Sequence, residues 1–127
     1  MPLFRNMIQR SLKVLFDHSF LLFGARGTGK TSFIRDLFKG QATLWLDLLD
    51  PAQEDRYQRN PNELWMILED PQQRPPWVVI DEVQKVPALL NVAHRSIESH
   101  GVHFALTGSS ARKLKRGSAN LLAGRAF

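Results

Sequence analysis

At 127 residues the chain has the length of a single domain, and its hydrophobic share of 43% and charged share of 23% are those of an ordinary globular protein. The absence of cysteine excludes disulfides and thiolate-bound metals, and fits a cytoplasmic location. No run approaches the roughly 18 apolar residues of a membrane-spanning helix, so no membrane contact is expected, while the net charge of +5 permits nucleotide or nucleic-acid partners without requiring them.

The N-terminal residues 1–19 predict an amphipathic helix that packs on the core. Charged residues interrupt an apolar series whose members share one face at helical spacing. That face consists of Leu3, Met7, Ile8, Leu12, Leu15 and Phe16. We therefore expect two parts, this helix and a core domain over residues 20–127.

The core begins with an apolar run, FLLF at 20–23, that predicts a short buried strand. A helix is expected to start within the glycine-rich stretch that follows and to end at Gly40. Its apolar face consists of Phe33, Ile34, Leu37 and Phe38. The segment TLWLDL at 43–48 then has the length and composition of a second strand.

The middle of the chain is polar, and LDPAQEDRYQRN at 49–60 predicts a loop. A helix start is indicated by Asn60 as N-cap, Pro61 in the first turn and the acid Glu63. That helix is expected to stop at Pro71.

The last third of the chain alternates strand and helix signals. WVVI at 77–80 predicts a third strand, residues 87–101 a helix that ends at Gly101, and HFAL at 103–106 a fourth strand before a final helical stretch. Strands that alternate with helices predict an α/β fold with a mainly parallel sheet and right-handed crossovers.

The glycine-rich stretch, GARGTGKT at 24–31, fits the pattern G-x-x-x-x-G-K-[ST]. Its glycines let backbone N–H groups turn toward an anion, and the next helix points its positive end at the same place. An unliganded glycine turn is the alternative, but the flanking strand and helix favour phosphate binding, with Lys30 on the β- and γ-phosphates and Thr31 on Mg²⁺. The predicted phosphate-binding residues are Gly24, Ala25, Arg26, Gly27, Thr28, Gly29, Lys30, Thr31 and Ser32.

A pair of acids, Asp81 and Glu82, ends the third predicted strand. The carboxyl ends of parallel strands are where ligands bind in open α/β sheets. Asp81 is expected to hold Mg²⁺ and Glu82 to polarise an attacking water. A small-molecule kinase usually lacks such a pair, so the acids favour hydrolysis over phosphate transfer.

Hydroxyl side chains follow the fourth predicted strand in TGSS at 107–110. One of them is expected to contact the γ-phosphate or the attacking water, with a helix N-cap as the alternative for each serine. The basic stretch at 111–118, ARKLKRGS, is interpreted as a solvated helix face, with a nucleic-acid footprint as the alternative.

Together these motifs make the chain resemble a prokaryotic AAA-type ATPase core of the kind followed by a C-terminal domain of unknown function. The resemblance runs from about residue 20 to 127 and rests on GARGTGKT, LDLLDP, VVIDEVQKVP and LTGSSARKLKRGSANLLAGRA. It implies a three-layer P-loop fold with strand order 1-4-3-2, Ser109 or Ser110 as a sensor of nucleotide state, and Arg125 as an arginine finger toward a neighbouring subunit, for which a terminal arginine without a role is the alternative. The family's fifth strand and helical lid are expected to be missing from this chain.

Two functions remain open from the sequence. The first is Mg²⁺-dependent hydrolysis of ATP that drives conformational change in a larger assembly, with Lys30, Glu82, Ser109 and Arg125 as catalytic residues. The second is a nucleotide-binding or nucleic-acid-associated module without useful turnover.

Overall fold

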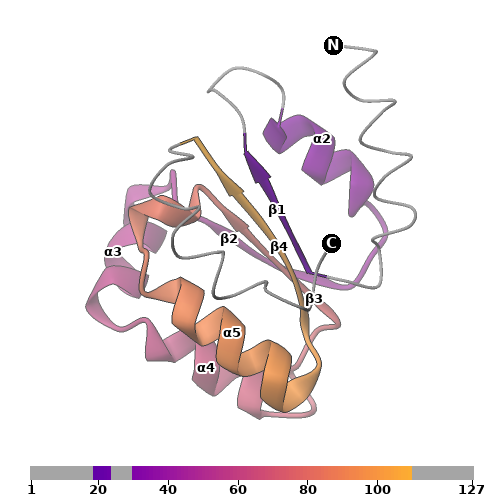
Figure 1. The fold of residues 1–127 in the computed structure, drawn as a ribbon, viewed down its shortest axis with the longest axis vertical. Helices are drawn as coiled ribbons and strands as arrows, with labels where there is room; N and C mark the ends of the chain where they lie inside the picture. Colours follow the sequence, from indigo (N-terminus) through magenta and orange to yellow (C-terminus); the bar gives the residue numbers. More distant parts are fainter. Residues whose placement is uncertain (1–18, 24–29, 110–127) are drawn as a thin grey trace.

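Four parallel strands form the centre of the molecule (Figure 1). The computed structural model of the protein describes residues 19–23 and 30–109. The strands are β1 (Phe20–Phe23), β2 (Thr43–Asp47), β3 (Trp77–Asp81) and β4 (His103–Gly108). They lie in the order β1-β4-β3-β2, which confirms the predicted α/β class and strand order. The predicted N-terminal helix lies, apart from residue 19, outside the described residues.

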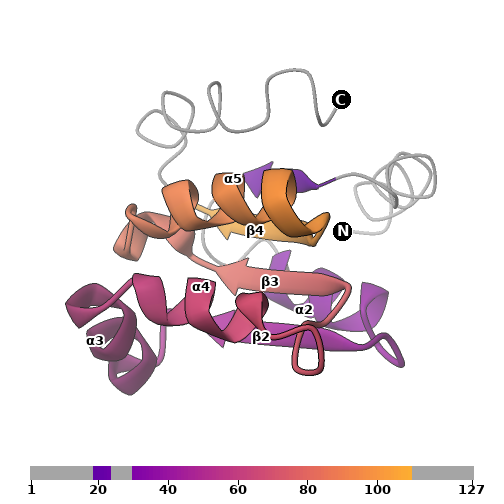
Figure 2. The ribbon, with the colours of Figure 1, turned by 90° about the horizontal axis from the view of Figure 1, so that it is seen from below.

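Helices cover both faces of this sheet and give three layers. Helix α2 (Lys30–Leu37) covers one face, while α3 (Pro51–Arg59), α4 (Asn62–Glu69) and α5 (Leu89–His100) cover the other. In the turned view of Figure 2, α4 and α5 lie in front of the sheet and α2 lies behind it. None of the described helices has the length and hydrophobicity needed to cross a bilayer.

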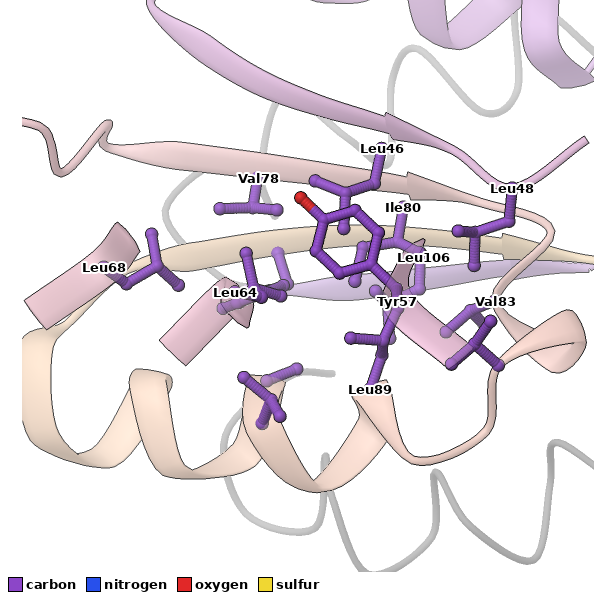
Figure 3. Close-up of a cluster of buried hydrophobic side chains, with 14 of the residues drawn as sticks. Leu46, Leu48, Tyr57, Leu64, Leu68, Val78, Ile80, Val83, Leu89 and Leu106 are labelled. Atoms are coloured by element: carbon purple, nitrogen blue, oxygen red, sulfur yellow. The ribbon is translucent and has the colours of Figure 1, made fainter. Parts of the chain in front are cut away.

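The strands are apolar on both faces because both faces are covered. Every residue of β3 is buried, and the larger core cluster fills the space between β2, β3, β4 and the helices α3 to α5 (Figure 3). The smaller cluster packs α2 against the opposite face. It consists of Phe20, Leu22, Phe33, Ile34, Phe38, Trp77, Val79 and Ala105.

The prediction of a loop at 49–60 is wrong for most of that segment, because helix α3 occupies Pro51–Arg59. The Asp50 carboxylate accepts a hydrogen bond from the backbone N–H of Ala52 at 3.0 Å, and Pro51 occupies the first turn. Both are helix-start signals. The helix is polar on its outer side and is fixed by one buried aromatic residue, Tyr57 at 3% exposure.

The junction between α3 and α4 also corrects the predicted cap. Asn60 ends α3, where its backbone N–H donates to the carbonyl oxygen of Arg56, and α4 begins after Pro61 without a side-chain cap. The Arg56 guanidinium donates to the Glu63 carboxylate across the junction, with Nε 2.7 Å from Oε1, and this bond lowers the pKa of Glu63. A two-residue connection, Asn60 and Pro61, thus joins two helices where the sequence pattern had predicted a loop followed by one helix.

The predicted end of the helix at 87–101 is confirmed. Helix α5 ends at Gly101, whose φ of 66° is left-handed, and its backbone N–H donates to the carbonyl oxygen of Ile97. Glycine adopts this conformation without the steric cost that other residues incur.

Candidate functional site

The carboxyl ends of the parallel strands meet at one edge of the sheet. β1 ends there at Phe23, β2 at Asp47, β3 at Asp81 and β4 at Gly108. Helix α2 begins at Lys30, after the connection from β1. The sheet order places β4 between β1 and β3, so its end lies beside both. Polar residues that are far apart in sequence therefore come together at this edge.

Asp81 is the centre of a hydrogen-bonded cluster. Its carboxylate accepts from the Thr31 hydroxyl at 3.1 Å through Oδ2 and from the Thr107 hydroxyl at 2.5 Å through Oδ1. Asp81 is 1% exposed, and no basic side chain among those the structure describes forms an ion pair with it. A carboxylate buried this deeply with only hydroxyl donors is suited to a cation.

Thr107 connects the two acids. Its hydroxyl donates to Asp81 and accepts the backbone N–H of Glu82 at 3.0 Å, and the residue is fully buried. The register explains this contact, because Ile80 pairs with Leu106 and the next residues of the two strands are therefore neighbours. The sequence identified Thr107 only as one of several hydroxyls, and this bridging position was not predicted.

Glu82 is held in an unusual backbone conformation. Its φ of 63° and ψ of 53° are left-handed, the only such values for a residue other than glycine in the described part of the chain. This conformation costs on the order of 1 kcal/mol and is found mainly at functional sites. The side chain is 3% exposed, and its carboxylate accepts from the Ser109 hydroxyl at 2.9 Å and from the Gln84 amide.

A third acid stands at the same edge. Asp47 pairs in register with Asp81 on the neighbouring strand. Its Oδ1 accepts the backbone N–H of Leu49 at 3.0 Å, and its own backbone N–H donates to the Gln53 side chain. Asp47 thus supports the turn after β2. Its presence at this edge could have been predicted from the sequence, because it is an acid at the end of the second predicted strand.

The structure brings together four of the residues predicted from the sequence: Thr31, Asp81, Glu82 and Ser109. Ser32 is exposed on α2. Lys30 opens α2, but its side chain lies outside the described part of the chain. The predictions for residues 24–29, for Ser110 and for Arg125 also fall outside the described residues.

Replacing Thr107 with valine is expected to lower the free energy of unfolding by about 2–4 kcal/mol. Valine keeps the shape but leaves a buried oxygen of Asp81 without its donor and the backbone N–H of Glu82 without its acceptor. Urea denaturation followed by circular dichroism measures the change. The control is Thr43→Val, where an exposed hydroxyl bonds the Gln41 carbonyl oxygen and a loss within about 0.5 kcal/mol is expected. Equal losses for the two variants would contradict the bridging role.

Comparison with known families supports an assignment of the chain. The chain matches a family model described as AAA domain over residues 17–127. The match includes all the described strands and helices, and therefore the whole cluster around Asp81 and Glu82. No curated protein matches the chain.

Proposed function

We propose that the chain, which belongs to the AAA domain family, binds ATP with Mg²⁺ and hydrolyses it to drive conformational change in a larger assembly. Membership of this family suggests a nucleotide-binding ATPase. The observation that carries the proposal is the hydrogen bond between Thr31 and Asp81. It joins the first turn of the helix after the glycine-rich stretch to the acid that ends β3. These are the two places from which P-loop proteins hold the metal of a bound nucleotide.

The residues around Asp81 fit a magnesium ion by their chemistry. Mg²⁺ prefers oxygen ligands, keeps several waters and is usually bound through one or two protein groups together with phosphate oxygens. The Thr31 hydroxyl and the Asp81 carboxylate supply such oxygens within hydrogen-bond distance of each other. No group of three or more histidine, aspartate or glutamate side chains in the described residues forms a metal cage of its own. When bound, Mg²⁺ would neutralise charge on the β- and γ-phosphate oxygens.

Phosphate binding is assigned to the glycine-rich stretch and to Lys30. The backbone N–H groups of residues 24–29 would surround the phosphates, and the N-terminus of α2 would point its dipole at them. The Lys30 ammonium would contact the β- and γ-phosphates. Support comes from the position of α2, whose first turn already contacts Asp81 through Thr31.

Glu82 and Ser109 are proposed to act on the attacking water and the γ-phosphate. Glu82 would accept a proton from the water as general base. Ser109, at the end of β4, would bond the γ-phosphate and so couple the nucleotide state to the strand. Their support is the 2.9 Å hydrogen bond between them, together with the Thr107 hydroxyl, which bonds both the Glu82 backbone and the Asp81 carboxylate.

The test is phosphate release from Mg·ATP by the purified chain, with ATP binding measured by calorimetry on the same preparation. We expect saturable release that stops when EDTA removes Mg²⁺ or when the protein is heat-denatured. Binding without phosphate release would instead favour the nucleotide-binding module without turnover. Neither binding nor release would contradict both functions.

A further inference from the structure

A glutamine that neither the motifs nor the family match assigns a role contacts the proposed base. Gln84 lies in the short 3₁₀ turn η1 (Val83–Lys85), directly after Glu82. Its Nε2 donates to the Glu82 carboxylate and lies 3.3 Å from the Ser109 hydroxyl oxygen. Since Ser109 also donates to Glu82, the three side chains form a closed ring of contacts.

These contacts fix which way the amide points. A carboxylate accepts hydrogen bonds and repels a carbonyl oxygen, so only the NH₂ group of Gln84 can face Glu82. The carbonyl oxygen Oε1, on the same carbon as this nitrogen, is then left to accept from a different donor. This oxygen is buried, and no hydrogen-bond donor among the described residues reaches it. A buried acceptor without a donor is costly and is rare in native proteins unless it serves a site.

We propose that Gln84 is a further residue of the hydrolytic centre, whose amide holds the Glu82 carboxylate in place and whose Oε1 accepts a hydrogen bond from the attacking water. The proposal rests on the hydrolysis proposed above. In this proposal the attacking water is the hydrogen-bond donor that the Gln84 Oε1 atom otherwise lacks.

The geometry of a water molecule agrees with this pair of acceptors. An attacking water has two O–H groups and must point a lone pair at the γ-phosphorus. Its two hydrogens therefore need two acceptors on the side away from the phosphate. Glu82 supplies one and Gln84 Oε1 supplies the other, and the two are neighbours because the amide nitrogen beside Oε1 already bonds Glu82. Two fixed acceptors hold the water in one orientation, whereas one leaves it free to rotate.

The chemical step then balances. The water oxygen forms a new bond to the γ-phosphorus, and the bond from that phosphorus to the bridging oxygen breaks. The electron pair of the broken bond leaves with ADP. One proton of the water passes to Glu82, and the other stays on the oxygen that becomes part of the released phosphate. Gln84 keeps its own protons throughout and acts only on the orientation of the water and of the base.

A purely structural role for Gln84 makes a different prediction. If the amide only braced the turn after β3, its loss would lower stability and weaken nucleotide binding together. If it orients the water, its loss should lower kcat and leave binding nearly unchanged, because the ground state does not depend on that orientation.

The test is Gln84→Met, which keeps the length of the side chain and removes both its donor and its acceptor. We expect kcat for Mg·ATP hydrolysis to fall roughly 10- to 100-fold, less than removal of a general base would cost. The dissociation constant of Mg·ATP by calorimetry should stay within about twofold. The matched control is Gln73→Met in the exposed turn after α4, where no change in either value is expected.

A second variant keeps the test decisive if methionine disturbs folding. Gln84→Asn retains the amide but withdraws it by one methylene, and the same selective fall in kcat is expected. Unchanged kcat in the two Gln84 variants, beside an active wild type, would overturn the role of Gln84 alone. A parallel loss of affinity and thermal stability would also overturn it, in favour of the bracing role. A wild-type chain that binds Mg·ATP and releases no phosphate would instead refute the proposed hydrolysis, and this inference with it.

Discussion

Lys30→Ala is expected to abolish Mg·ATP binding while the fold persists. A lysine on the β- and γ-phosphates makes charge-assisted hydrogen bonds, each worth about 1.5–3 kcal/mol. The loss of two such bonds corresponds to a fall in affinity of roughly 10²- to 10⁴-fold. Calorimetric titration with Mg·ATP measures the effect, and circular dichroism with a thermal melt checks that the fold is kept.

A matched control for this lysine lies just beyond the other end of the same helix. Lys39 is exposed in the turn after α2, so Lys39→Ala removes the same charge away from the proposed phosphate site. Its affinity for Mg·ATP should match that of the wild type. If Lys30→Ala bound the nucleotide as tightly as Lys39→Ala, the assignment of residues 24–31 to phosphate binding would be wrong.

Glu82→Gln is expected to keep Mg·ATP binding and to lower hydrolysis by about 10²- to 10⁴-fold, the range for loss of a general base. Glutamine has nearly the same shape, so the left-handed backbone at position 82 and the contact with Ser109 can persist. It cannot accept the proton of the attacking water. Release of phosphate under saturating Mg·ATP measures kcat directly.

The control for this variant is Glu69→Gln, at the exposed end of α4 and in the layer of helices opposite α2. It makes the same change of charge and should leave kcat unaltered. Equal phosphate release from wild type and Glu82→Gln would exclude Glu82 as the base. Loss of binding in Glu82→Gln would indicate instead that the acid holds the metal or the loop.

The sheet was predictable because its strands are short apolar runs bounded by polar turns. WVVI and HFAL do not alternate apolar and polar residues, as a strand with one exposed face would. The helix between them favours a parallel arrangement of the strands. The order β1-β4-β3-β2 came from family resemblance and is confirmed. The strand β4 runs two residues further than its apolar run, to Gly108, because its pairing with β1 continues through Thr107 and Gly108.

Helix α3 was missed because its stability depends on contacts that a local pattern does not contain. Its nine residues include a single buried apolar side chain, Tyr57, so hydrophobic periodicity gives no signal. The start signal, Asp50 followed by Pro51, was present in the sequence. The polarity of the segment nevertheless favoured a loop. In the folded protein the helix forms because Tyr57 packs into the core.

The candidate site, like the fold, was predicted only in part. The motifs identified Thr31, Asp81 and Glu82 one by one, and their positions at strand and helix ends predicted that they would meet. The roles of these residues and of Lys30 stay predictions. Gln84 was not predicted, because a glutamine two residues after an acid has no motif of its own, and only the folded turn brings its amide to Glu82.

The left-handed residue at the end of β3 explains how two consecutive acids, Asp81 and Glu82, can join one hydrogen-bonded cluster. In an extended strand, neighbouring side chains point to opposite faces, so an acid directly after Asp81 would be directed toward α4 and α5. The positive φ of Glu82 turns the chain at that residue, and its carboxylate instead meets Ser109, which follows Thr107 at the two-residue interval that keeps to one face. A β-branched residue at position 82 would resist this turn, so the backbone there restricts which side chains are tolerated independently of their charge.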